Sequence, residues 1–280
     1  DKLRGYRTKP LAVLASSFEE VILMDADSLM FIDPYYLFET NGYINYGMIL
    51  FKDYVDCLKY VNRKFIDEIG IGAEYYCNKT HNYEIDSSCV VVNKKKAWEA
   101  LFTICIINVE SDSYYGHPLR KNNVLGDKDT WLIGSMFVGF NPHIVNTNPG
   151  IMLVSKNADC NPYTQNCDMD MVLGHVQFHY TRDFQIFMNE EESVLPIYCN
   201  NQALDLSEFD GMEDWGYIDS VKNPSMLKTY KGNYKKLTPN MSNAFKTASK
   251  ALKEILKIID PTPPSKLLRK HKMVVSNMIN

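Results

Sequence analysis

The sequence predicts an α/β fold in which a mixed, mostly parallel sheet is flanked by helices. Two observations lead to this prediction. Short, continuous apolar runs occur at residues 21–24 and 88–92, and segments of helical periodicity alternate with them along the chain. Short continuous apolar runs are typical of strands buried on both faces, and strands that alternate with helices favour a parallel core. With 280 residues, the chain is long enough to bury a sizeable core.

The first elements can be placed from their boundary residues. Thr8 is a candidate N-cap for a helix that has Pro10 in its first turn and Phe18 on its apolar face. The strand at residues 21–24 follows, and Asp33-Pro34 predicts a turn after it. The later predicted elements are a strand at residues 43–51, a helix at 54–69, a strand at 88–92, a helix at 98–109, a helix at 128–140, and strands at 151–155 and 172–178.

The last third of the chain has a different pattern. Residues 201–235 are polar and predict loops, residues 241–259 predict an amphipathic helix, and the tail from Lys266 is basic. The predicted inward side chains of this helix are Phe245, Ala248, Ala251, Leu252, Ile255 and Ile258. We therefore expect an α/β domain at residues 1–200 and a loop-rich C-terminal segment at residues 201–280.

Charge and cysteine content limit the class of protein. The net charge of −4 gives no electrostatic reason to expect nucleic acid as a partner. The chain starts at Asp1 without a visible signal peptide or membrane span, so we expect N-terminal sequence to precede it. None of the seven cysteines forms a CxxC pair, and Cys160 and Cys167 are candidates for a local disulfide. Sequons at Asn78 and Asn240 favour the secretory pathway.

The acidic triplet Asp25-Ala26-Asp27 is the main chemical signal. It follows the apolar run of residues 21–24 directly. Two carboxylates at positions i and i+2 of a strand end can reach one cation, and hard oxygen ligands suit Mg²⁺ or Mn²⁺. Such a cation binds phosphates, and ligands of open α/β folds bind at the carboxyl ends of strands. A solvated turn is the alternative interpretation of the triplet.

Three segments carry a resemblance to a known family. TKPLAVLASSFEEVILMDADSLMFIDPYYLF resembles the metal-binding segment of GT-A glycosyltransferases, while YEIDSSCVVVNKKKAWEAL and VLGDKDTWLIGSMF look like the fungal Golgi alpha-mannosyltransferases. The resemblance covers residues 6–155 and fades after Phe178. It implies a type II Golgi membrane protein, GDP-mannose as donor, Mn²⁺ as metal, a mannose-containing glycan as acceptor, and retention of anomeric configuration. The alpha-1,3 linkage is slightly favoured over alpha-1,2.

The same resemblance implies a donor site. Asp25 and Asp27 would hold the metal and the diphosphate, with Ala26 between them. Lys9 matches a lysine that related transferases aim at the donor, although a surface lysine would look the same. Asp86 and Ser87 would lie near the donor sugar, where Asp86 would bind sugar hydroxyls or orient the acceptor. Asp and Ser also favour turns at the start of a strand, which is the alternative for this pair.

The resemblance leaves two assignments open. Asp127 or Asp129 would face the anomeric carbon or the acceptor hydroxyl, although capping and the helix dipole explain the same residues. A third metal ligand in GT-A enzymes is often a late histidine, for which His179 is preferred over His175. For both histidines, the alternative is a purely structural role.

The resemblance also indicates what precedes the triplet in the family. GT-A domains begin with a strand-helix-strand unit that binds the nucleoside, and only a short stretch precedes residues 21–24 here. We therefore expect the chain to lack this first unit. Two other functions remain open at this point: a related transferase that uses a UDP-hexose, and a non-catalytic lectin-like remnant of the fold. A donor panel separates the first from mannosyl transfer, and calorimetry with GDP and Mn²⁺ separates the second.

Overall fold

A computed structural model of the chain describes residues 5–59, 61, 63–78, 82–109, 127–155, 169–180, 184, 194–200, 216–218 and 235–259. The described residues form a mixed α/β structure that divides into two compact units. The first comprises residues 1–204 and 214–237, and the second comprises residues 205–213 and 238–280. Cys160 and Cys167, the predicted disulfide pair, lie outside the described residues.

The first unit contains a four-stranded sheet in the order β1-β4-β3-β5. These strands are β1 (Glu20–Met24), β4 (Tyr83–Asn93), β3 (Met48–Asp56) and β5 (His143–Ile144). The pairs β1–β4 and β3–β4 are antiparallel, and β3–β5 is parallel. The prediction of a mostly parallel sheet is therefore wrong. The apolar runs indicated burial on both faces, and burial does not depend on strand direction.

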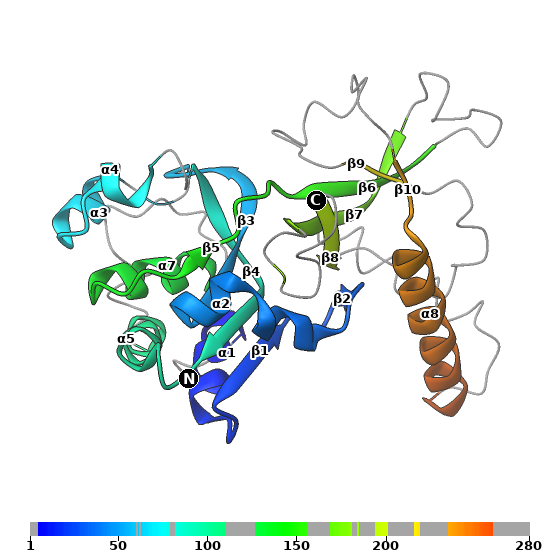
Figure 1. Ribbon diagram of the computed structural model, residues 1–280, viewed down its shortest axis with the longest axis horizontal. Coiled ribbons are helices and arrows are strands. Elements are labelled where there is room, and N and C mark those ends of the chain that lie inside the picture. The colour runs from blue at the N-terminus through cyan, green and yellow to red at the C-terminus, as the bar shows by residue number, and fades with distance from the viewer. Residues whose placement is uncertain are drawn as a thin grey trace. The chain divides into compact units, whose positions relative to one another are not determined.

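Both faces of this sheet are indeed covered. Along β3, Met48 and Leu50 belong to one buried cluster, while Ile49 and Phe51 belong to another. The first cluster includes residues of the helices α1 (Thr8–Ala15), α5 (Trp98–Val109) and α7 (Lys128–Phe137), which lie against one face of the sheet (Figure 1). The second cluster includes Tyr198 and other residues of the second sheet. Strand β1 is only half buried, whereas β3 and β4 are almost fully buried.

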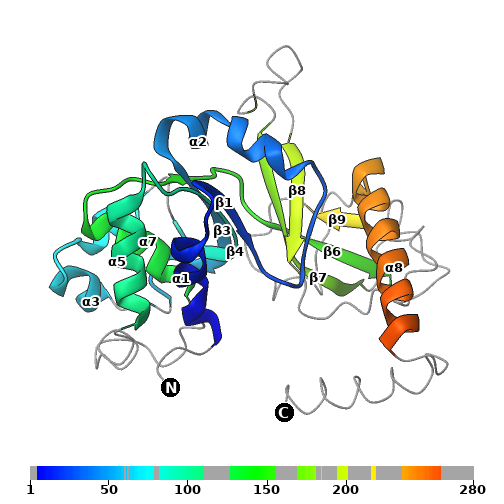
Figure 2. The same ribbon diagram turned by 90° about the horizontal axis from the view of Figure 1, so that it is seen from below.

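The second sheet has the strand order β10-β9-β6-β7-β8-β2, and its pairs are antiparallel. Its strands are β2 (Ser28–Met30), β6 (Gly150–Ser155), β7 (Met169–Tyr180), β8 (Val194–Asn200), β9 (Gly216–Ile218) and β10 (Lys235–Lys236). Because β2 follows β1 after three residues, the acidic triplet is the turn that carries the chain from the first sheet into the second (Figure 2). The two short strands β9 and β10 lie in the region where we predicted loops.

Several predicted boundaries differ from the structure. Residues 43–46, predicted as strand, belong to helix α2 (Asn41–Tyr46), because the Thr40 side chain caps it and Gly47 ends it with φ +74°. The helix predicted at 54–69 is shorter, since β3 runs to Asp56 and α3 spans Arg63–Glu68. Phe18 lies beyond α1 and is exposed. Other short helices are η1 (Gly5–Arg7), η2 (Pro34–Glu39) and α4 (Ala73–Tyr76).

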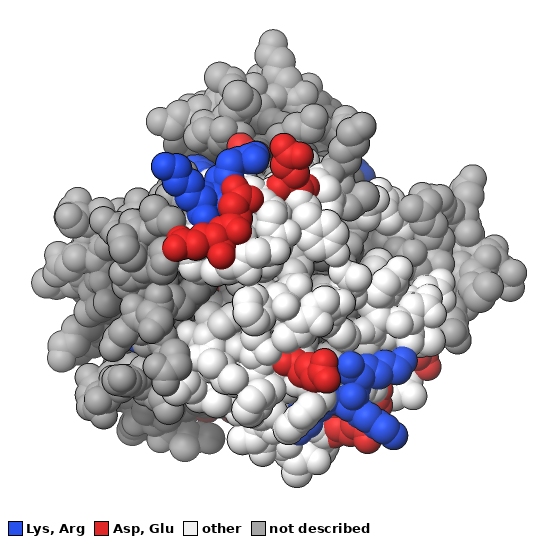
Figure 3. Space-filling view, turned by 90° about the vertical axis from the view of Figure 1, so that its left-hand side faces the viewer, with Lys and Arg blue, Asp and Glu red and all other residues white. Residues whose placement is uncertain are grey.

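A disulfide between Cys57 and Cys77 closes the segment that carries α3 and α4. The sequence did not predict this pair. On the face shown in Figure 3, Lys and Arg mix with Asp and Glu in two groups, with an uncharged area between them. Before β1, the described residues form η1 and α1, and no strand precedes β1 among them.

The described part of the second unit is helix α8 (Pro239–Ile259). Phe245 is buried as predicted, whereas Ala251 is exposed. The side chains of Leu252, Ile255 and Ile258 and the basic tail from Lys266 lie outside the description. Among the described helices, none combines the length and the apolar character needed to cross a membrane.

Candidate active site at the end of strand β1

The acidic triplet lies at the carboxyl end of β1. The backbone N–H of Asp25 donates to the carbonyl of Ser88 at 2.8 Å, and the N–H of Ser28 donates to the carbonyl of Asp25 at 3.0 Å. The side chain of Asp25 is 20% exposed, while Ala26 and Asp27 are exposed. The turn thus has a fixed backbone, with Asp27 exposed and Asp25 partly exposed.

Lys9 brings a positive charge to this turn from the second residue of α1. Its Nζ lies 2.5 Å from Asp25 Oδ1 and 3.4 Å from Asp127 Oδ1. Burial lowers the pKa of Lys9, but the charges and hydrogen bonds of Asp127 and Asp25 outweigh burial and raise that pKa overall. Lys9 is therefore a charged bridge between the triplet and the start of α7. These contacts do not fit the alternative, in which Lys9 is a lysine at the surface of the helix.

Asp127 is almost fully buried, with 1% of its side chain exposed. It stands at the N-cap position of α7, but its side chain makes no capping hydrogen bond. Its carboxylate instead accepts from Ser87 Oγ at 3.2 Å and from Trp131 Nε1 at 2.7 Å. Burial raises the pKa of Asp127, while Lys9 and the Trp131 hydrogen bond oppose the rise. Capping thus does not explain this side chain.

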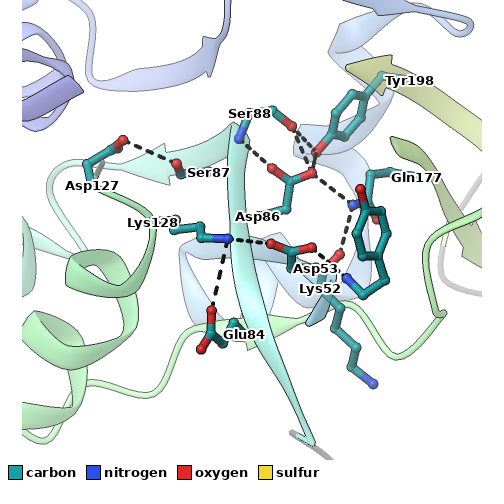
Figure 4. A network of polar contacts seen from close by, with 11 residues as sticks. Lys52, Asp53, Glu84, Asp86, Ser87, Ser88, Asp127, Lys128, Gln177 and Tyr198 are labelled. Atoms are coloured by element: carbon teal, nitrogen blue, oxygen red, sulfur yellow. Dashed lines mark hydrogen bonds and ion pairs between the residues drawn. The ribbon is translucent and has the colours of Figure 1, made fainter. Parts of the chain in front are cut away.

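Asp86 lies on the other side of β4 from Ser87 (Figure 4). Its Oδ1 accepts from the N–H of Ser88 at 2.9 Å, and its Oδ2 accepts from Ser88 Oγ at 2.8 Å. Two residues of the second sheet also donate to Oδ2: Gln177 Nε2 at 2.9 Å and Tyr198 OH at 3.4 Å. The Asp86 carboxylate is therefore a junction between the two sheets.

Of the other predicted residues, Asp129 and His179 contact other parts of the unit, whereas the backbone of His175 lies two strands from Ser28, the residue after the triplet. Asp129 is fully buried. Burial lowers the pKa of Lys128, but the charges of Asp53, Asp129 and Glu84 outweigh burial and raise that pKa overall. His179 is buried between the rings of His143 and Phe184, whose centroids lie 6.1 Å and 5.0 Å away. His175 lies on β7 opposite Asn200 of β8, and Asn200 pairs in turn with Ser28. The structure therefore brings together Lys9, Asp25, Asp27, Ser87 and Asp127.

Sequence reasoning missed several residues that support this site. A buried cluster lies beside it, in which Lys128 Nζ is 2.5 Å from Asp53 Oδ2 and 4.0 Å from Glu84 Oε2 (Figure 4). Trp131, Gln177 and Tyr198 were also missed. The only local signal was the spacing of Trp131, four residues after Asp127 on one helical face.

Asp25 and Asp27 are the residues that can hold a cation here. The pKa of Asp27 is raised by partial burial and by the charges of Asp25 and Asp86, so acidic groups crowd this turn. Within the described ranges, no three His, Cys, Asp or Glu side chains lie close enough to hold a metal ion. Mg²⁺ typically binds through one or two carboxylates together with waters and substrate phosphates. One exposed carboxylate, Asp27, beside a partly exposed one, Asp25, fits that kind of site.

Comparison with known proteins identifies a family. The family model "Mannosyltransferase putative" matches residues 1–71 and 72–172. Alpha-1,3-mannosyltransferase MNT3 of Saccharomyces cerevisiae is 28% identical over 48% of this chain and 25% of its own length. Alpha-1,2-mannosyltransferase MNN21 of Candida albicans is 25% identical over 49% of this chain and 26% of its own length.

Alpha-1,2-mannosyltransferase MNN2 of Saccharomyces cerevisiae matches a longer segment, with 23% identity over 74% of this chain and 38% of its own length. The chain thus spans between a quarter and two fifths of the length of these three relatives. The family model covers more than half of the chain and includes every residue gathered at the end of β1. The chain therefore belongs to the mannosyltransferase family that this model describes.

Proposed function

We propose that this chain is the catalytic part of a metal-dependent alpha-mannosyltransferase with a GT-A-like fold. It would move mannose from GDP-mannose to a mannose hydroxyl of a glycan, with retention of configuration. The observation that carries the proposal is the convergence of Lys9, Asp25, Asp27 and Asp127 at the carboxyl end of β1. The names of the relatives support mannose as the sugar and leave both the alpha-1,2 and the alpha-1,3 linkage open. We favour alpha-1,3.

Asp25 and Asp27 would hold Mn²⁺ or Mg²⁺ in this proposal. Their carboxylates supply hard oxygen ligands on an accessible turn, and their mutual repulsion would be relieved by a cation. When bound, the cation would offset the negative charge of a diphosphate leaving group. His175 and His179 remain proposals as further ligands, and the ring packing of His179 against Phe184 gives no support to its choice.

Lys9 would act on the diphosphate. Its ammonium already lies between two carboxylates, so the end of β1 is built to hold a positive charge. A fixed cation near the departing diphosphate stabilises the charge that develops as the bond to the sugar breaks. Lys9 would also keep the buried Asp127 in its ionised form, because it opposes the rise in the pKa of that carboxyl.

Asp127 is the better of the two candidates in the third segment. Both residues are buried, but Asp127 contacts Lys9 and Ser87, whereas the charge of Asp129 acts on Lys128. Trp131 and Ser87 fix the orientation of the Asp127 carboxylate, as a group that faces an anomeric carbon or an acceptor hydroxyl requires. We propose Asp127 as the catalytic carboxylate. Ser87 would orient it.

The secretory pathway, and the Golgi in particular, is the proposed compartment. The Cys57–Cys77 disulfide supports an oxidising environment, and the sequon residue Asn78 beside it is exposed. A membrane anchor outside residues 1–280 is part of the same proposal.

A donor panel tests the proposed function. Labelled GDP-mannose, UDP-glucose and UDP-galactose are each incubated with the protein, Mn²⁺ and a mannose disaccharide, and transfer is measured. We expect transfer from GDP-mannose and its loss in Asp27→Ala, with Glu74→Ala as the control for an exposed carboxylate on α4. Preference for a UDP-sugar would refute the mannose assignment, and wild-type transfer by Asp27→Ala would refute the metal assignment.

A further inference from the structure

The acidic turn is attached to the structure on both sides. Before the turn, Leu23 and Met24 of β1 pair with β4 of the first sheet. After the turn, Ser28 pairs with Asn200 of β8 in the second sheet. The positions of Asp25 and Asp27 therefore depend on how the two sheets are joined. At that junction, residues far from the triplet in sequence can affect the conformation of the triplet.

The polar part of the junction is a set of hydrogen bonds to Asp86, beside the apolar cluster that also joins the sheets. Gln177 of β7 and Tyr198 of β8 donate to Asp86 Oδ2, and Gln177 Nε2 also donates to the carbonyl of Lys52 on β3 at 2.8 Å. Ser88 donates to both oxygens of Asp86, and its carbonyl accepts from the N–H of Asp25. A continuous path of hydrogen bonds thus runs from the second sheet through Asp86 and Ser88 to the backbone of the triplet.

The same contacts commit Asp86 to the junction. Four donors share its two oxygens, and two of these donors come from the second sheet. Burial and the charge of Asp86 raise the pKa of Tyr198 well above its usual value, so the phenol stays a donor at neutral pH.

We propose that Gln177 and Tyr198 are positioning residues that act through Asp86 and Ser88 to fix the turn of Asp25 and Asp27. Asp86 is a member of this positioning path and not a group that reacts with substrate. The inference deepens the proposed function, because the turn that is fixed is the proposed cation site. The positioning itself stands on hydrogen bonds that exist without a cation.

Gln177→Met and Tyr198→Phe test the path, because each removes the donor to Asp86 and keeps most of the side-chain volume. Tyr43→Phe is the matched control. The Tyr43 hydroxyl donates to Glu20 Oε1 at 2.7 Å, so the control removes a tyrosine–carboxylate bond at the opposite end of the same strand β1.

The first measurement is hydrogen exchange of the Asp25 amide, followed by mass spectrometry or NMR. We expect exchange to be roughly tenfold faster in Gln177→Met and Tyr198→Phe and unchanged in Tyr43→Phe, because only the first two loosen the Ser88 carbonyl that protects this amide. Equal exchange at Asp25 in all four proteins would overturn the positioning role.

The second measurement is the affinity for Mn²⁺ without donor, by titration calorimetry. Loss of a partner that orients a ligand typically weakens metal binding about 10- to 100-fold, which we expect for Gln177→Met and Tyr198→Phe but not for Tyr43→Phe. Unchanged affinity in both variants would contradict the proposal. If the wild type takes up no Mn²⁺ while Asp25 exchange still rises in the variants, the cation site is wrong and the positioning path holds.

Asp86→Asn separates positioning from catalysis. Positioning predicts weaker Mn²⁺ binding and a higher KM for the donor, with a smaller effect on kcat. A loss of kcat on the order of a thousandfold with unchanged Mn²⁺ affinity would instead make Asp86 a catalytic residue.

Discussion

The variant Lys9→Met tests whether the charge of Lys9 stabilises the site, by its effect on the free energy of unfolding. Methionine keeps much of the length of lysine and removes its charge. At the observed 3.4 Å, the attraction between Lys9 and Asp127 is about 5 kcal/mol at an effective dielectric constant of about 20. Removing one partner of a fully buried pair costs about 3–5 kcal/mol. Because the side chain of Lys9 is 17% exposed and that of Asp25 is 20% exposed, we expect a smaller loss, roughly 2 kcal/mol at pH 7.

The loss should depend on pH in a defined direction. Burial raises the folded-state pKa of Asp127 above the ordinary 3.8, and Lys9 opposes this rise. Without Lys9 the folded pKa goes higher still. A carboxyl with a raised folded pKa contributes stability below its unfolded pKa and loses that contribution as pH rises through the folded pKa. The free energy of unfolding of Lys9→Met should therefore fall further below the wild type at pH 7 than at pH 4.

Urea denaturation of both proteins at pH 4 and pH 7 measures this difference. Lys96→Met is the control, because Lys96 Nζ donates to the backbone carbonyl of Ile44 and its loss leaves no buried carboxylate unpaired. Its effect should be the same at both pH values. If Lys9→Met loses as much stability at pH 4 as at pH 7, Lys9 does not compensate the buried charge of Asp127.

Two further predictions concern parts of the fold that hold the site in place. The double variant Cys57→Ser/Cys77→Ser should lose about 3 kcal/mol in urea denaturation, because the bridge closes a separation of 20 residues; insensitivity of the wild type to reductant would contradict this. Gly134→Ala should cost about 1–3 kcal/mol and lower the Tm in calorimetry, because the new Cβ would lie 2.6 Å from Ile104 Cγ1 and 3.1 Å from the Ile104 backbone. An unchanged Tm would show that α5 and α7 can separate at this point.

The triplet was predictable because its signal is local. Helix α1, strand β1 and Asp25-Ala26-Asp27 follow one another along the chain, and the structure has them in that order. Helix α2 had a local signal too, in the Thr40 cap and in Gly47 at its end. The apolar residues at 43–51 favour a strand, but the cap at Thr40 and the left-handed Gly47 make residues 41–46 helical.

Strand direction and the Asp86 junction could not be predicted in the same way. Direction depends on connections such as the disulfide-closed segment between β3 and β4, whose course has no periodic signal. Gln177 and Tyr198 lie 91 and 112 positions from Asp86, and each is a polar residue within a strand. Such a residue predicts a buried hydrogen bond but does not identify its partner.

Crowded carboxylates explain why a junction between sheets is a suitable place for this site. Burial is the main cause of the raised pKa of Asp27, and repulsion from the charges of Asp25 and Asp86 raises it further. A turn free to relax would move these charges apart into solvent. Here β1 pairing holds one end of the turn and β2 pairing holds the other, so the repulsion persists. Lys9 offsets part of this repulsion. The remaining repulsion would favour a further positive charge at Asp27. In the proposed cation site, attachment of the turn at both ends would keep the two carboxylates in place for the metal.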